Sequence, residues 1–209
     1  MTDINRATAA LRGRRLEYFT IVWNTLEGLL SLIAGALAGS IALVGFGIDS
    51  FIEVTSAGAL LWRMSVDYDA EHRERNERVA LQIVGGCFIG LALYVAAESI
   101  KTLLTRGVPE HSVFGIAIAI ASLVVMPLLA RAKRKVAAGL NSVAMKADSR
   151  QTDFCMYLSA ILLTGLVLNW LFGWWWADPL AALVMVPIIA KEGVDGLRAK
   201  ACANCSPPY

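Results

Sequence analysis

Apolar stretches separated by short polar segments fill most of the chain. Each apolar stretch is about 17 to 25 residues long, which is the length that a helix needs to cross a bilayer. Because backbone groups in lipid must be hydrogen-bonded within their own segment, each stretch is predicted to be an α-helix. The pattern therefore predicts an all-α membrane protein with six transmembrane helices, at about 18–37, 39–62, 79–104 and 113–130, in a fifth span that ends near Phe172, and in a sixth that reaches about Ala190.

These spans divide the chain into three parts. Residues 1–17 form a basic, amphipathic N-terminal segment, residues 18–190 form one six-helix membrane domain, and residues 191–209 form a short polar tail. The tail is too short to fold as a soluble domain. We expect no cleaved signal peptide, because the first apolar stretch contains Asn24 and Glu27 and is not followed by a small-residue cleavage site.

The composition supports this assignment and adds an orientation. Of all residues, 57% are apolar and 17% are charged, which is typical of a polytopic membrane protein. Of the 19 Lys and Arg residues, only Lys101 and Arg106 lie on one side of the predicted membrane. The positive-inside rule therefore predicts that the N-terminus, the C-terminus and the charged loop Arg63–Arg78 are cytoplasmic, in a protein of the inner cell membrane.

The second span carries two acids, Asp49 and Glu53, in a stretch without Lys or Arg. Their i, i+4 spacing places both on one helix face, near the middle of the membrane. An ionised carboxylate there costs at least about 2.5 kcal/mol, so a cation, protons or both must compensate the pair. Carboxylate oxygens at this spacing suit one side of a Zn²⁺, Mn²⁺, Fe²⁺ or Co²⁺ site, although hydrogen bonds to hydroxyl groups or a neighbouring Arg would also compensate them.

The fifth span contains a short sequence match to the second span. The run Ser142–Met145 matches Ser40–Leu43 at an offset of 102, which sets Gln151 opposite Asp49 and Cys155 opposite Glu53. In addition, Asp148, Gln151 and Cys155 follow i, i+3, i+7 spacing and share one helical stripe. All three can ligate a metal ion, and a thiolate would favour softer ions such as Zn²⁺, Cd²⁺ or Co²⁺. The alternative is that Cys155 is a small apolar filler.

Three further polar residues in the spans are second-rank pathway candidates. Glu27 and Asn24 of the first span either line a cation or proton pathway or make an ordinary interhelical hydrogen bond. Asp153 points away from the stripe of the fifth span, and it either lines the pathway or pairs with Lys146 or Arg150.

Other polar residues have a simpler explanation. Glu98 is expected to form an i, i+3 ion pair with Lys101 at the membrane interface. His72 belongs to a charged loop that is expected to be solvated. The single pair Cys202 and Cys205 has the spacing of half a zinc knuckle and is weak evidence for a metal site.

The second-span motif GSIALVGFGIDSFIE resembles that of the cation diffusion facilitator family, and NSVAMKADSRQTDFC resembles its fifth-helix motif more weakly. The segment WADPLAAL before the sixth span is also similar, and the likeness is strongest to a divergent branch that includes transmembrane protein 163. The resemblance implies a six-helix transporter in which two polar residues from each of two helices bind a divalent cation and exchange it for protons. By position these are Asp49 and Glu53 with Gln151 and Cys155, preceded by Asp148. The His and Asp that the family has in its fifth helix are absent, as is the cytoplasmic domain that usually follows the sixth helix.

We therefore expect a secondary exporter of a Zn²⁺-like divalent cation, with Co²⁺, Cd²⁺, Fe²⁺ and Mn²⁺ as other substrates to consider. Its expected partners are membrane lipid, protons and a second copy in a homodimer, with no nucleic acid and no bound cofactor. A membrane metal-binding protein that does not transport and an exporter of organic cations are the alternatives. We do not expect an enzyme, because no nucleophile and base are arranged together and no phosphate-binding loop is present.

Overall fold

The computed structural model describes the backbone of residues 3–65, 70–140 and 143–198. Within these ranges it describes the side chains as well, except those of residues 3–7, 63–65, 70–81, 143–144 and 147. Within these ranges the chain forms helices and short connections only. The helices are α1 (Asp3–Ala38), α2 (Ile41–Ser65), α3 (Ala70–Thr105), α4 (Val113–Leu140), α5 (Val143–Phe172) and α6 (Ala177–Leu197).

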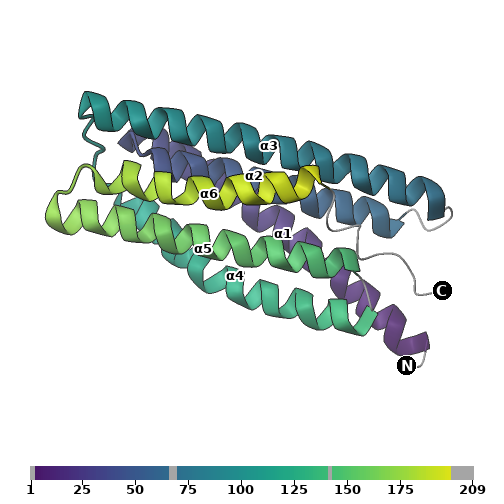
Figure 1. Ribbon diagram of the computed structural model, residues 1–209. Coiled ribbons are helices and arrows are strands. Elements are labelled where there is room, and N and C mark those ends of the chain that lie inside the picture. The colour runs from purple at the N-terminus through teal and green to yellow at the C-terminus, as the bar shows by residue number, and fades with distance from the viewer. Residues whose placement is uncertain (1–2, 66–69, 141–142, 199–209) are drawn as a thin grey trace.

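The helices form one elongated bundle in which α1 begins and α6 ends at the same end (Figure 1). Helix α1 packs on α2 and α4, and α5 packs on α2 and α4, so these four helices form a closed ring. Helices α3 and α6 pack on each other and cover the ring at α2 and α5. The interior of the ring is the place where polar side chains from four helices can meet.

Small residues bring the helix axes close together. A Cβ atom on Gly47 of α2 would lie 3.1 Å from the Gly28 carbonyl oxygen of α1 and 3.0 Å from Leu32 Cγ. A Cβ on Gly85 of α3 would lie 2.8 Å from the Gly193 carbonyl oxygen of α6. These approaches are the kind that glycine permits between membrane helices.

The outside of the bundle is apolar. Large hydrophobic side chains such as Val22, Leu93 and Val124 are more than half exposed, as expected for a surface that faces lipid tails. By length and composition, α1 to α5 each contain a stretch that can cross a membrane. Helix α6 is the shortest at 21 residues and is not among these candidates; it begins next to Asp178 and ends with Lys191, Glu192 and Asp195.

The helices are longer than the predicted spans. Helix α2 continues to Ser65 and α3 begins at Ala70, so much of the stretch Arg63–Arg78, which we expected to be a loop, is helical. The basic stretch after the fourth span is likewise part of α4. Hydropathy predicts which part of a helix lies in lipid, but it does not predict where the helix ends. Charged residues such as Arg, Lys and Glu have high helix propensity, so the helix continues beyond the membrane.

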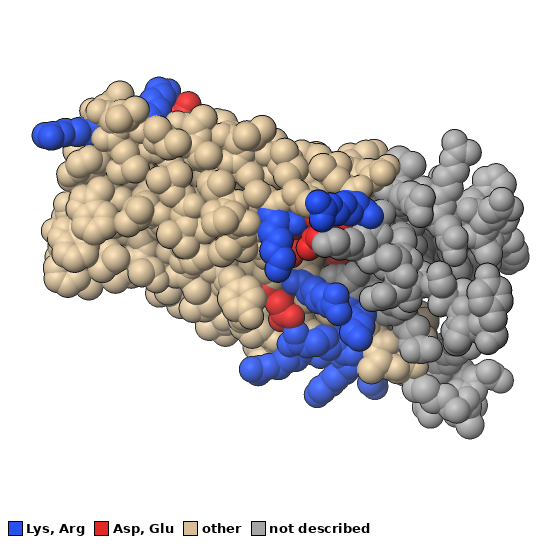
Figure 2. All heavy atoms as spheres, viewed as in Figure 1, with Lys and Arg blue, Asp and Glu red and all other residues tan. Residues whose placement is uncertain are grey.

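Lys and Arg gather at one end of the molecule. Figure 2 shows most of the visible basic side chains towards the end where α1 begins and a smaller group at the opposite end. We call the first the basic end. Lys101 belongs to the other end, and its predicted ion pair with Glu98 is confirmed, at 3.1 Å.

A buried aspartate joins α6 to α2. Asp178, at the start of α6, accepts a hydrogen bond from the Ser40 hydroxyl at 2.5 Å and another from the Ile41 backbone N–H at 3.0 Å. The Ser40 hydroxyl oxygen in turn accepts the Leu43 N–H at 3.1 Å. Together they cap the N-terminus of α2, where unpaired N–H groups and the helix dipole favour an anion. This cap fixes the depth of α2, the helix that carries Asp49 and Glu53.

Candidate cation site

Asp49 and Glu53 both point into the bundle. Their exposed fractions are 2% and 1%, although the two lie on a helix that crosses the membrane region. Among the described residues, no Lys or Arg forms an ion pair with either carboxylate. Glu53 Oε1 accepts a hydrogen bond from the Thr152 hydroxyl of α5 at 2.8 Å, and Glu53 Oε2 has no hydrogen-bond partner. The pair is therefore neither turned to lipid nor held by a permanent basic partner.

Cys155 of α5 lies among these acids. Its thiol is 1% exposed, and it interacts with the carboxylates of Asp49 and Glu53. Its Sγ also lies 4.0 Å from Glu27 Oε1, a distance at which a thiol donates a weak hydrogen bond. The expected alignment of Cys155 with the second-span acids is thus seen in space.

Glu27 of α1 is the third acid of this group. Trp23 Nε1 donates to Glu27 Oε2 at 2.9 Å, and the Ser50 hydroxyl donates to Glu27 Oε1 at 2.9 Å. Since Ser50 belongs to α2, the expected interhelical hydrogen bond exists. The same carboxylate also lies near Cys155. Glu27 is therefore closer to the candidate site than expected for a residue that the sequence analysis treated only as a second-rank pathway candidate. We refer to Glu27, Asp49, Glu53 and Cys155 as the acid–thiol cluster.

The cluster is not a preassembled metal site. Among the described residues, no three His, Cys, Asp or Glu side chains converge closely enough to hold one ion. Instead, neutral donors hold the carboxylates apart: Trp23 and Ser50 hold Glu27, and Thr152 holds Glu53.

The remaining predicted residues lie around the cluster. Gln151 is half-buried, and its amide nitrogen has no hydrogen-bond partner. Asn24 is fully buried and donates to the Thr20 carbonyl of its own helix at 3.1 Å. Asp148 is buried but accepts from Lys133 Nζ at 2.5 Å, which gives it a basic partner that the sequence did not indicate. The ligand role of Gln151 and Asp148 and the pathway role of Asn24 stay predictions.

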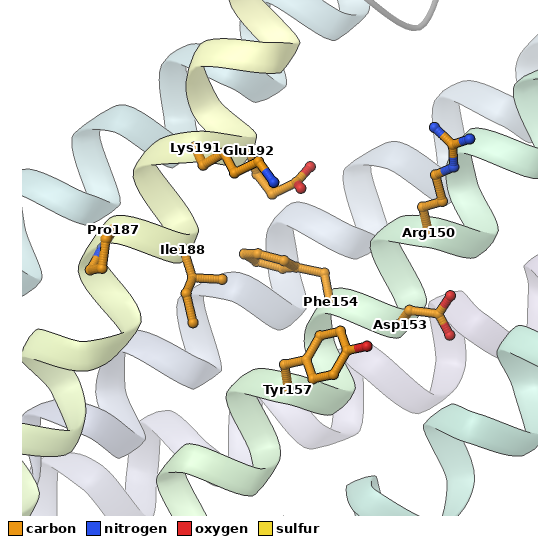
Figure 3. A pocket seen from close by; sticks show the side chains of 8 residues that line it. All are labelled: Arg150, Asp153, Phe154, Tyr157, Pro187, Ile188, Lys191 and Glu192. Carbon is orange, nitrogen blue, oxygen red and sulfur yellow. The ribbon is translucent and has the colours of Figure 1, made fainter.

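Asp153 lies on a different face of α5 and pairs with Arg134 of α4, instead of Lys146 or Arg150. It lines a groove of about 460 Å³ between α5 and α6, shown in Figure 3. Lys191 and Glu192 of α6 lie across this groove from Arg150 of α5, and Ile188 of α6 and Tyr157 of α5 are among its other lining residues (Figure 3).

Two of the sequence hypotheses cannot be placed. The side chain of His72 and the pair Cys202 and Cys205 lie outside the described residues. Conversely, sequence reasoning missed Glu17 and Lys133, which are both fully buried, and the capping role of Asp178. The quoted segment WADPLAAL contains Asp178, but Glu17 and Lys133 belong to basic segments outside the motifs that the sequence singled out.

Comparison with known proteins agrees with this architecture. The cation efflux transmembrane domain model matches residues 18–201. An uncharacterized transporter of Methanocaldococcus jannaschii is 30% identical over 184 residues, which are 84% of this chain and 64% of that protein. The cation-efflux pump FieF of Shewanella oneidensis is 25% identical over 174 residues, 79% of this chain and 58% of the pump. Transmembrane protein 163 of Xenopus laevis is 26% identical over 133 residues, 64% of this chain and 47% of that protein.

The chain therefore belongs to the cation efflux family, the cation diffusion facilitators that its second-span motif resembles. It is an integral membrane protein of a cation-transporting family. The chain spans about half to two thirds of the length of the curated relatives that it matches.

Proposed function

We propose that this protein exports a Zn²⁺-like divalent cation from the cytoplasm in exchange for protons. The observation that carries the proposal is the acid–thiol cluster, which brings three carboxylates and a thiol from α1, α2 and α5 into the centre of a membrane bundle. Buried intramembrane acids of this kind mark ion pathways far more often than they serve structure.

The donor set favours a transition metal over Mg²⁺ or Ca²⁺ as the substrate. Asp49 and Glu53 supply hard oxygen ligands, and the Cys155 thiolate supplies a soft one that suits Zn²⁺, Cd²⁺ or Co²⁺. We propose Asp49, Glu53 and Cys155 as ligands, with Gln151 as the fourth by analogy with the family.

Proton exchange follows from the same groups. Carboxylates and a thiol deep in a low-dielectric environment cannot all stay charged without a cation, so they bind protons when the cation has left. Since metal binding requires the deprotonated ligands, each arrival of the cation releases protons and each release of the cation takes them up.

The distribution of Lys and Arg supports an orientation with both chain ends in the cytoplasm, where the basic end would face the source of the cation. A second copy, as in a homodimer, is part of the same proposal.

The test uses purified protein in liposomes with an imposed pH gradient. Zn²⁺ should move into the acidic compartment as protons leave it, and Asp49→Asn should lower the initial rate by at least about 100-fold while the protein still inserts and stays monodisperse. Glu98→Gln, an exposed acid near the opposite end, is the matched control and should keep the wild-type rate. Wild-type flux in Asp49→Asn would disprove the assigned site, and Zn²⁺ movement that ignores the gradient would disprove proton exchange.

A further inference from the structure

A second buried charged group lies between the acid–thiol cluster and the basic end. Lys133 of α4 forms ion pairs with Glu17 of α1 at 3.3 Å and with Asp148 of α5 at 2.5 Å. The side chains of Lys133 and Glu17 are fully buried, and that of Asp148 is 4% exposed. We refer to Glu17, Lys133 and Asp148 as the lysine triad.

The triad lies on the helices that build the cluster, nearer to their basic ends. Glu17 precedes Glu27 by ten residues on α1, and Asp148 precedes Cys155 by seven on α5, which corresponds to roughly 10 to 15 Å along the helix axes. Thr152 connects the two groups, because its hydroxyl donates to Glu53 at 2.8 Å and lies 3.3 Å from the Asp148 carbonyl oxygen. Lys133 also interacts electrostatically with Glu53.

The charges of the triad do not balance. Two carboxylates share one ammonium group, so with all three groups ionised the triad carries one excess negative charge inside the bundle. Glu17 Oε2 lies within ion-pair range of Lys133, whereas Glu17 Oε1 and Asp148 Oδ1 are buried and make no hydrogen bond in the described structure. Such buried acid oxygens are costly, and replacing the single charge of an ammonium by the double charge of a metal ion would neutralise both carboxylates.

We propose, on the basis of the transport function proposed above, that Glu17 and Asp148 form an access site for the divalent cation. The ammonium group of Lys133 competes with the cation for these two carboxylates. A cation that arrives from the basic end displaces the ammonium group from the two carboxylates and then passes to Glu53 beside Thr152. Competition with Lys133 keeps the access site weak, so that it raises the local cation concentration without retaining the ion.

The first experiment counts bound ions. Zn²⁺ binding to the purified full-length chain is measured by equilibrium dialysis in an Asp49→Asn background, which removes the deep site. Adding Lys133→Met should create one bound Zn²⁺ per chain, and adding Glu17→Gln to that double variant should abolish it. A monodisperse Asp49→Asn/Lys133→Met protein that binds no Zn²⁺ would overturn the proposal.

The second experiment does not need the lysine to be removed. Glu17→Gln leaves one acid and one lysine in the triad and should fold, so its transport is measured in liposomes. The KM for Zn²⁺ should rise about tenfold with kcat unchanged, because cation capture is weakened and the deep site is intact. Glu98→Gln, which removes an ion pair with Lys101 at the opposite end of the bundle, should leave both constants unchanged.

These outcomes separate the access site from the transport function. A purely structural triad would lower kcat or stability in Glu17→Gln without a selective rise in KM, which would also overturn the access site. A wild-type protein that transports no Zn²⁺ would overturn the proposed function, whereas an unchanged KM in an active Glu17→Gln protein would overturn the access site alone.

Discussion

The Ser40 hydroxyl donates a 2.5 Å hydrogen bond to Asp178, a residue 138 positions away in the chain. Both residues are buried at the end of the bundle opposite the basic end, where α2 and α6 begin. The contact ties the four-helix ring to the α3–α6 pair at this end of the bundle.

Asp178→Asn should lower the stability of the protein by about 1.5 kcal/mol, because a hydrogen bond to a charged acceptor is exchanged for one to a neutral amide and the anion at the α2 N-terminus is lost. Thermal unfolding of the purified protein in detergent measures the effect. Glu110→Gln, an exposed acid in the connection before α4, is the control and should unfold at the wild-type temperature. An unchanged midpoint for Asp178→Asn would show that the cap contributes nothing.

Gly47→Ala should destabilise the α1–α2 packing by about 1 to 3 kcal/mol, since its Cβ would lie 3.1 Å from backbone atoms of Gly28 and Leu32 and the helices would have to separate. Gly58→Ala on the same helix is the matched control, because a Cβ there meets no atom within 4 Å. The control should be neutral or stabilising by up to about 1 kcal/mol through helix propensity. Equal effects of the two substitutions, measured by thermal unfolding, would contradict the close packing of α1 and α2.

The helical membrane fold could be predicted from the sequence, because hydropathy and backbone hydrogen bonding in lipid depend on each segment by itself. Five of the six predicted helices meet the length and composition of a membrane span, and the family match confirms the fold class. The inward orientation of Asp49 and Glu53 also followed from local arguments, since two carboxylates facing lipid would be too costly.

The partners of the polar residues could not be predicted in the same way. Asp148 and Cys155 share one stripe of α5, but two helical turns separate them by about 10 Å. As a result Cys155 joins the acids of α1 and α2, while Asp148 meets Lys133. Lys133 lies in the basic run Arg131–Lys135, and only the packing of α1, α4 and α5 shows that this one lysine is buried.

Glu27→Gln should weaken Zn²⁺ binding by about 10- to 100-fold, the usual effect of removing a group that supports metal ligands. Glutamine keeps the size of the side chain and an oxygen for the Ser50 hydroxyl, but it removes one of the three carboxyl groups around Cys155 and with it one site that can carry a negative charge when the cation binds. Isothermal titration of the purified protein with Zn²⁺ measures the change. If the variant binds as tightly as the wild type, Glu27 is a structural hydrogen-bond acceptor only.

Cys155→Ser should change which cation is preferred more than how fast any cation moves. Serine is nearly the same size as cysteine, but a hydroxyl is a harder and weaker ligand than a thiolate, so binding of Cd²⁺ and Zn²⁺ should suffer more than that of Mn²⁺. Competition in liposomes between Cd²⁺ and Mn²⁺ gives the kcat/KM for Cd²⁺ divided by the kcat/KM for Mn²⁺. This ratio should fall about tenfold in the variant. Cys87→Ser is the control, because Cys87 is exposed on the surface of α3 and should leave the ratio unchanged. The buried thiol would be a packing residue if Cys155→Ser lowered the rates for both ions equally, since a loss of packing has no reason to distinguish a soft ion from a hard one.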